Sequence, residues 1–136
     1  MKKLIDRLEL GKKFKSGSIV PLKVKELVRN LTIYDQIKAL TTVEMWKNNQ
    51  VPREYAVYAR TMMPIYDMVH FMTWQQSKEK GIEEELDSGR IIHPIHATLN
   101  VHYDSFSITD GITRIRVFNQ RGLEYIPTEL YLDRTR

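Results

Sequence analysis

The segment of this chain best equipped for chemistry lies near its C-terminal end. It reads Thr109, Asp110, Gly111, Ile112, Thr113, Arg114, Ile115 and Arg116. A strand-like pattern precedes Asp110, and a helical pattern of apolar residues begins after Gly111 and stops at Gly122. The first turn of a helix offers unpaired N–H groups and about half a positive charge. An anion such as a phosphate is therefore expected to bind at this turn.

Each residue of the turn has an expected role in holding a phosphate. Gly111 lets a ligand approach the backbone closely. The hydroxyl of Thr113 can donate a hydrogen bond, and the guanidinium of Arg114 can donate two parallel ones. Arg116 adds a second cation, although two residues along a helix turn it away from Arg114. In the competing structural interpretation, Asp110 caps the helix, Gly111 makes the turn, and both arginines are solvated.

The elements expected around this turn include a small sheet. Residues 19–24 are apolar and β-branched, and Pro21 near their start indicates an edge strand. Residues 95–103 alternate between apolar and polar types, which predicts a strand with one buried face. Residues 106–109 return as its partner, and residues 123–132 form a further extended segment. With the helices, these strands predict an α+β fold.

A helical block is expected between the first strand and the second. A threonine and two prolines indicate three helix starts, an asparagine pair ends the first helix, and two lysines with a glycine end the third. In chain order these residues are Thr32, Asn48, Asn49, Pro52, Pro64, Lys78, Lys80 and Gly81.

Positive charge is concentrated in the N-terminal part of the chain. The net charge is +4, whereas residues 1–29 contain nine Lys and Arg against three acidic residues, a local excess of +6. Such a segment can lie along a polyanion, because each neutralised phosphate releases counterions. Lys12, Lys13 and Lys15 are the expected nucleic-acid contacts, and the acidic residues 79–87 would repel DNA. The alternative is a solvated tail.

The composition excludes several classes of protein. Because the chain has no cysteine, disulfides, thiolate zinc sites, iron–sulfur clusters and cysteine nucleophiles are excluded. No apolar stretch reaches the roughly 18 residues of a membrane helix, and charges at residues 2–7 argue against a signal peptide. We therefore expect a cytoplasmic protein without membrane contact. His96 and His102 would lie about 20 Å apart on one strand, too far to share a metal ion, and no metal site is expected.

Three motifs follow one another in the second half of the chain. They consist of Gly89, Pro94 and Ile95, then Asp110, Gly111 and Arg114, and finally Gly122, Ile126 and Pro127. In this order and spacing, residues 86–130 resemble the ParB/sulfiredoxin superfamily. There, a glycine and a Pro-Ile pair lead into the sheet, a D-G-x-x-R turn opens a helix, and a G-x-x-x-(I/V)-P segment returns to the sheet. Residues 20–24 are similar to the family's opening strand.

The resemblance implies the organisation of the whole chain. Residues 1–136 would form a single α+β domain whose small mixed sheet has ParB/sulfiredoxin-like topology. A basic arm would cover about residues 1–17, and the ParB-like core about residues 18–30 and 88–133. The helical block over about residues 33–87 would be an insert longer than the family usually has.

The resemblance also implies a phosphate or nucleotide pocket at the turn, where members of the family bind ATP or CTP. Their activities include DNA partition with CTP hydrolysis, nuclease activity, sulfinic-acid repair and free-serine phosphorylation. The expected binding residues are Gly111, Ile112, Thr113, Arg114, Arg116 and His93. Asp110 is the catalytic candidate, which would cap the helix or hold a metal-bound water. Ile112 stands where sulfiredoxins have their reactive cysteine, which excludes that chemistry, and an isoleucine transfers no proton.

Three functions are left open by these observations. The first is a phosphate-binding module that engages a nucleotide or DNA, as a nuclease or a partition-type accessory. The second is ATP-dependent phosphotransfer to a small hydroxyl compound, in which Mg²⁺ bridges the phosphates and Glu26 and Asp35 are the nearby acids. The third is a non-catalytic protein–protein adaptor that uses the helical insert as its interface. Catalysis and oligomeric state are open as well.

Overall fold

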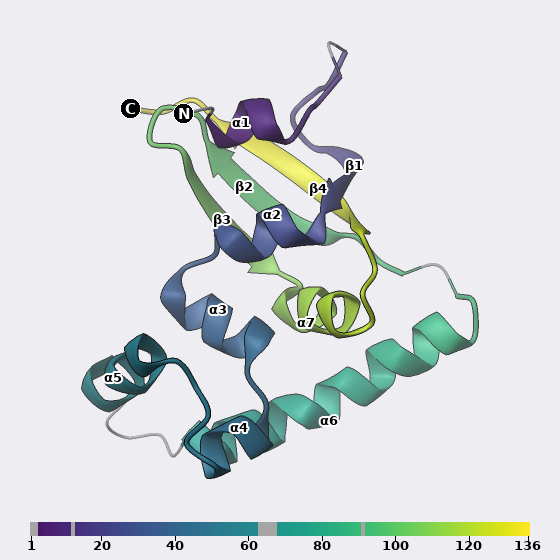
Figure 1. Cartoon of the computed structure of the whole chain (residues 1–136). Helices are drawn as coiled ribbons and strands as arrows, with labels where there is room; N and C mark the ends of the chain where they lie inside the picture. The colour runs from purple at the N-terminus through teal and green to yellow at the C-terminus, as the bar shows by residue number, and fades with distance from the viewer. Residues whose placement is uncertain (1–2, 12, 63–67, 91) are drawn as a thin grey trace.

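A computed structural model describes residues 3–11, 13–62, 68–90 and 92–136. Within these residues the chain has an α+β fold, with one open mixed sheet in its upper half and a group of helices below it (Figure 1). The strands are β1 (Ser18–Lys23), β2 (Ile95–Asn100), β3 (Ser105–Asp110) and β4 (Tyr125–Asp133). The helices are α1 (Leu4–Arg7), α2 (Val24–Arg29), α3 (Ile33–Leu40), α4 (Val43–Lys47), α5 (Arg53–Met62), α6 (Met68–Asp87) and α7 (Ile112–Gln120).

The sheet combines two antiparallel pairings with one parallel pairing. Its strand order is β1-β4-β2-β3, in which β1 and β4 are antiparallel, β4 and β2 are parallel, and β2 and β3 are antiparallel. The prediction that Pro21 lies in an edge strand is confirmed, since β1 is the first strand of the sheet and Pro21 pairs with Pro127 of β4. An edge position suits proline because it lacks a backbone N–H donor.

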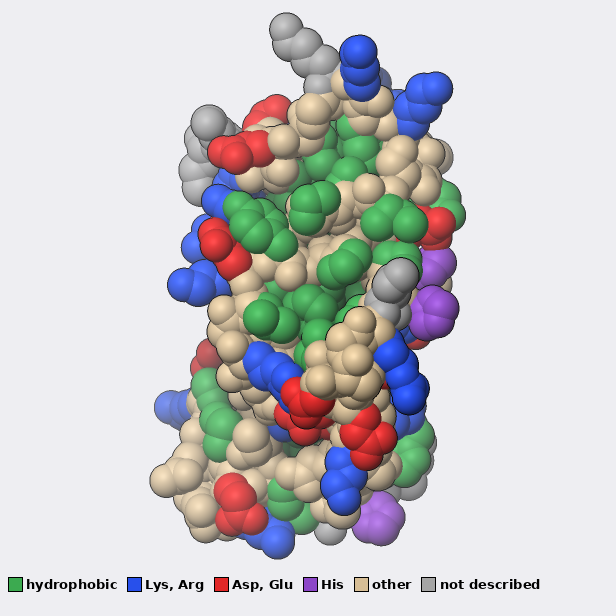
Figure 2. Space-filling model, turned by 90° about the vertical axis from the view of Figure 1, so that its right-hand side faces the viewer, with side chains coloured by type: hydrophobic (Ala, Val, Ile, Leu, Met, Phe, Trp, Pro, Cys, Tyr) green, Lys and Arg blue, Asp and Glu red, His purple; other side chains and the backbone are tan. Residues whose placement is uncertain are grey.

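One face of the sheet forms the main core. The period of two in β2 places Ile95, Ala97 and Leu99 on that face, where all three are buried. They pack in one cluster with residues of α2 and α7, as the alternation predicts. Hydrophobic side chains also stay partly exposed around the sheet, among them Ile19 and Tyr125. Figure 2 shows a group of hydrophobic side chains over the sheet half of the molecule.

The helical block has a core of its own. Ile37, Val43, Tyr55, Met68 and Met72 form a second buried cluster, contributed by α3, α4, α5 and α6. Helices α3 and α6 also contact α7. The block therefore packs directly against the helix that follows the turn at Gly111. Among the described residues, none of the helices combines the length and the apolar composition that a membrane span requires.

Local capping rules describe parts of this block correctly. Thr32 is the N-cap of α3, because its hydroxyl accepts a hydrogen bond from the Asp35 N–H at 3.2 Å, and α5 begins directly after Pro52. The helix expected to run on to Asn48 is interrupted, however. Thr42 caps a separate helix, α4, through the Met45 N–H. Pro64 lies outside the described residues.

Two further boundaries differ from the sequence prediction. Residues 24–29 form α2, which was not expected. Helix α6 does not end at Gly81 but continues to Asp87, and Gly89 is the glycine with positive φ, +71°, beyond its end. The extra turns are held by α7, since Arg121 pairs with both Glu83 and Asp87. Tertiary contacts thus outweigh the helix-breaking tendency of one glycine.

Candidate functional site

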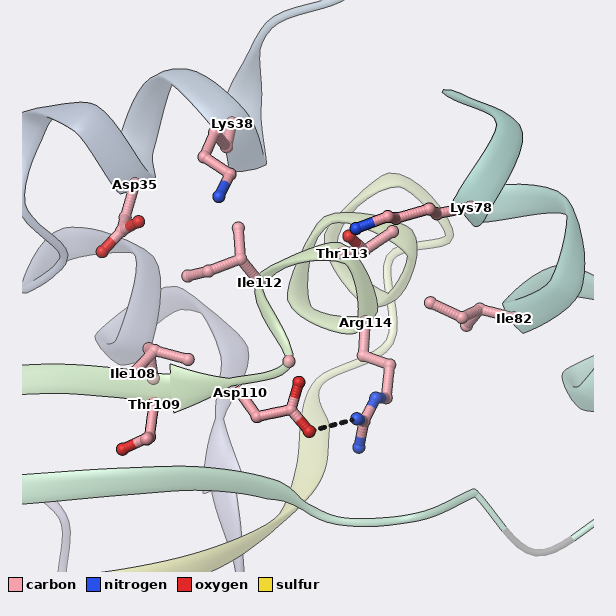
Figure 3. Close-up of a pocket in the computed structure, with 11 residues that line it drawn as sticks. Asp35, Lys38, Lys78, Ile82, Ile108, Thr109, Asp110, Ile112, Thr113 and Arg114 are labelled. Carbon is pink, nitrogen blue, oxygen red and sulfur yellow. Dashed lines mark hydrogen bonds and ion pairs between the residues drawn. The ribbon is translucent and has the colours of Figure 1, made fainter. Parts of the chain in front are cut away.

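A cavity of about 340 Å³ opens at the start of α7. One side of the cavity is the end of β3 and the first turn of α7, and the other side consists of α3 and α6 of the helical block (Figure 3). Five residues expected from the sequence line it together: Asp110, Gly111, Ile112, Thr113 and Arg114. His93 and Arg116 are not among the lining residues.

Gly111 makes the turn between β3 and α7. It is the N-cap of α7, with φ +119° and ψ +15°, a conformation that side-chain-bearing residues rarely adopt. We expected the missing side chain to leave room for a ligand. Instead, a Cβ built on Gly111 would lie 2.3 Å from the Cγ2 of Ile95 and 3.2 Å from its Cα. Gly111 therefore allows the turn to pass close to the beginning of β2.

Asp110 does not cap the helix, contrary to the structural interpretation of the sequence. It is the last residue of β3, and no side chain caps the N-terminus of α7. Its carboxylate, 67% exposed, accepts a hydrogen bond at 3.0 Å from Nη2 of Arg114. The N-cap position is taken by a glycine, so the first-turn N–H groups of α7 have no side-chain acceptor within the described residues.

Arg114 holds the turn to the segment that enters β2. Its Nη1 donates to the backbone carbonyls of His93 at 2.7 Å and Pro94 at 2.8 Å, in addition to the Nη2 bond to Asp110. His93 thus takes part through its carbonyl, while its side chain is exposed. A guanidinium has five N–H donors. Three of them are used within the protein, so Arg114 fixes the turn against the segment that enters β2.

Arg116 is buried, so neither the expected second cation at the pocket nor the solvated arginine of the competing interpretation is found. Its side chain is 1% exposed and forms an ion pair with Glu79 of α6. Its Nη1 donates to the backbone carbonyls of Lys38, at 2.9 Å, and Thr41. Because these groups surround the guanidinium, Arg116 cannot contact an anion in the cavity.

Two lysines of the helical block line the cavity and were not expected there. Lys38 of α3 and Lys78 of α6 extend towards the first turn of α7 from two sides (Figure 3). Burial is the largest influence on Lys38 and lowers the pKa of its ammonium; Asp35 acts in the opposite direction, and Lys78 lowers it further. Each ammonium also lies over an aromatic ring of its own helix, Lys38 over Tyr34 and Lys78 over Trp74.

Acidic residues also border the cavity. Asp35, one of the two nearby acids named from the sequence, lines it. The other, Glu26, instead pairs with Arg7 and Arg29. Within the described residues, no group of three or more His, Asp and Glu side chains could hold a metal ion. The site therefore combines lysine ammoniums and a helix N-terminus with two carboxylates, Asp35 and Asp110.

The remaining charged and histidine residues lie elsewhere. Lys13 and Lys15 are exposed in the segment before β1 and do not line the cavity, and Lys12 is outside the described residues. His96 pairs with Glu129 at 2.7 Å across the sheet. His102 lies in the turn after β2 instead of on the strand.

Comparisons of the chain with protein-family models, with curated proteins and with solved structures found no match. The cavity residues themselves are therefore the basis on which a function can be argued.

Proposed function

We propose that this protein binds a nucleotide, with the phosphate groups in the cavity at the first turn of α7. The observation that supports this most strongly is the convergence of three elements on one cavity. The N-terminus of α7, Lys38 of α3 and Lys78 of α6 all border it. These elements are distant in the sequence, and each supplies positive charge or N–H donors to the same space.

The first turn of α7 supplies the donors for one phosphate group. A left-handed glycine at the N-cap leaves the N–H groups of Ile112, Thr113 and Arg114 without a side-chain acceptor in the described part of the chain. N–H groups at a helix N-terminus bind anions, and the helix dipole adds to the attraction. The Thr113 hydroxyl lines the same cavity. The apolar side chain of Ile112 does not prevent this contact, because its backbone N–H is the donor.

The lysine pair accounts for further negative charge on the ligand. The ammonium of Lys38 is partly buried and also feels the charge of Lys78, and both effects lower its pKa. Two like charges facing one cavity repel each other, and an anion between them removes that repulsion. A ligand with two or more phosphate groups can contact the lysines and the helix N-terminus together.

The rest of the cavity suits an organic group attached to the phosphates. Ile82, Ile108 and Ile112 form an apolar part of its wall. Ligand sites commonly pair an apolar wall with a few polar groups that fix orientation. The likeness of the turn to the ATP- and CTP-binding turn of the ParB/sulfiredoxin superfamily supports the same ligand class. We propose the family's topology for the four-stranded sheet on the same motifs.

A second candidate function is phosphotransfer to a small hydroxyl compound. The observation that favours it is the presence of two carboxylates, Asp35 and Asp110, at the cavity with the cations. Carboxylate oxygens together with phosphate oxygens are the usual ligands of Mg²⁺. Asp35 and Asp110 are the residues that would hold the ion, which supplies neutralisation of phosphate charge when bound. Either carboxylate could also accept a proton from an acceptor hydroxyl.

Calorimetric titration tests the binding proposal. Wild-type protein is titrated with ATP, CTP, AMP and pyrophosphate, with and without Mg²⁺. We expect a triphosphate to bind more tightly than AMP, and Lys38→Met and Lys78→Met each to weaken binding by about tenfold, the effect of losing roughly 1.4 kcal/mol. Lys80→Met is the matched control, because Lys80 is an exposed lysine of the same helix outside the cavity lining.

Two results would contradict the proposal. One is the absence of heat and of thermal stabilisation with every phosphate compound. The other is an equal loss of affinity in the Lys80→Met control, which would indicate general attraction of anions by a basic protein. Consumption of ATP only when a hydroxyl acceptor is added would support phosphotransfer as well.

A further inference from the structure

Arg116 joins three helices beside the proposed phosphate site. Arg116 belongs to α7. Its Nη1 donates to the backbone carbonyls of Lys38 and Thr41 at the end of α3, and its Nε forms an ion pair with Glu79 of α6. The side chain is almost fully buried. The carbonyls at a helix C-terminus lack helical partners and form the negative end of the helix dipole. A buried guanidinium is therefore a well-matched partner for the end of α3.

We propose that Arg116 is a positioning residue, which sets where Lys38 and Lys78 stand relative to the phosphate-binding turn. This inference rests on the proposed function. The backbone carbonyl that Arg116 holds is that of Lys38 itself, and the carboxylate that it holds belongs to Glu79, the residue after Lys78. Through these contacts a single side chain orients both cavity lysines.

The rigidity of α7 makes this coupling direct. Thr113 and Arg116 are three residues apart in one helix, so the distance between the phosphate-binding turn and the guanidinium is fixed. Helices α3 and α6 contact α7 from the helical block. When Arg116 holds both of them, the two lysines are presented to the turn before a ligand arrives. Such preorganisation raises affinity because less ordering remains to be done on binding.

Stability alone does not explain a charge at this position. A buried ion pair is often no more stabilising than apolar residues of similar size. A second arginine of α7, Arg121, also joins α7 to α6, through Asp87 at 2.8 Å and Glu83 at 3.9 Å. Arg121 is exposed and has no hydrogen bond to α3 within the described residues. It provides a matched comparison, because it joins the same two helices without reaching Lys38.

The test combines replacement of the buried pair with a double-mutant cycle. In the Arg116→Met, Glu79→Met protein, the pair is replaced by apolar side chains and no charge is left buried without a partner. Pyrophosphate affinity is measured by calorimetry for wild type, this double variant, Lys38→Met and the three changes together. We expect the double variant to stay folded but to unfold at a lower temperature, because the carbonyls of Lys38 and Thr41 lose their donor, and to bind pyrophosphate about tenfold more weakly.

The cycle supplies the readout that a merely structural role would not change. Lys38→Met should weaken binding about tenfold in the wild type and less than about twofold in the double variant, because Lys38 is no longer held in place. Arg121→Ala should leave affinity unchanged. Arg116→Lys is a second variant, which keeps a charge for Glu79 but lacks the planar fork, and it should also bind pyrophosphate more weakly.

The outcomes separate this inference from the proposal on which it rests. If wild-type protein does not bind pyrophosphate or a nucleotide, the proposed function fails and the role of Arg116 fails with it. If wild type binds and either Arg116 variant retains full affinity, or if Lys38→Met has the same effect in both backgrounds, the positioning role alone is overturned. Weak binding by both Arg116 variants together with a non-additive cycle supports it.

Discussion

Replacement of Gly111 by alanine should destabilise the protein strongly, because two independent obstacles oppose a side chain there. The backbone of Gly111 has φ +119°, and positive φ costs an L-residue roughly 1–2 kcal/mol. The added Cβ would also lie 2.3 Å from Cγ2 and 2.7 Å from Cβ of Ile95. Forcing extra atoms into a packed core costs roughly 1–3 kcal/mol. We expect Gly111→Ala to lower the free energy of unfolding by about 2–5 kcal/mol.

Urea denaturation followed by circular dichroism measures this difference, and Gly122→Ala is the matched control. Gly122 also has positive φ, +68°, but a Cβ there would have no neighbour within 4 Å. The control should therefore lose only the backbone contribution, about 1–2 kcal/mol. Shortening Ile95 to alanine should not rescue Gly111→Ala, because the Cβ and Cα that alanine keeps would still lie 2.7 Å and 3.2 Å from the new atom.

Equal destabilisation by Gly111→Ala and Gly122→Ala would refute the steric argument. It would mean that the turn can move away from β2 without loss. The close approach of the first turn of α7 to the start of β2 would then not be a fixed feature of the site.

Three further outcomes are expected. Arg114→Ala should lower the free energy of unfolding by about 1–3 kcal/mol in the same urea assay, because two backbone carbonyls lose their donor. Asp110→Ala should change it by less than about 1 kcal/mol, since that carboxylate is exposed. Equal effects of the two variants would contradict this ranking. Gln75 is 2% exposed, and neither polar atom of its side-chain amide has a hydrogen-bond partner in the described part of the chain. Gln75→Met should therefore raise the free energy of unfolding by about 1–3 kcal/mol. A lower free energy of unfolding in this variant would indicate that the amide has a hydrogen-bond partner. The pKa of Lys38 is lowered, chiefly by burial, so Lys38 loses its proton at lower pH in the folded state than in the unfolded state. The free energy of unfolding should therefore rise with pH in the range just below the ordinary lysine pKa. Lys38→Met should remove that rise, and an unchanged profile of urea midpoint against pH would contradict the assignment.

Local sequence patterns predicted much of the frame of this site. The alternation of residues 95–100 predicted the buried face of β2, the proline in residues 19–24 predicted an edge strand, and Thr32 predicted the start of α3. The strand, turn and helix around Gly111 were predicted for the same reason. Each of these features depends on neighbours only a few residues away, so the chain around it is sufficient to predict it.

The features that were missed depend on contacts between distant segments. Lys78, Lys80 and Gly81 predicted a helix end, because cations in the last turn and a glycine after it commonly end helices. Contacts with α7 instead extend α6 to Asp87. Nothing near Lys38 or Lys78 in the sequence indicates that their helices border the turn at Gly111. Arg116 was expected as a second cation at the pocket or, in the competing interpretation, in solvent. Its burial was missed because it depends on a carboxylate 37 positions earlier in the chain. The break at Thr41 likewise follows from its burial against Trp46 and α7.

The most direct measurement of the central claim is the amide chemical shift of the first turn of α7 during titration with a phosphate ligand. ¹⁵N-labelled protein is titrated with pyrophosphate and with ATP. The largest changes are expected at the amides of Ile112, Thr113 and Arg114, since these are the N–H groups offered to the anion. Saturating changes confined to Lys13, Lys15 and other exposed cations, with the first turn of α7 unaffected, would contradict the account.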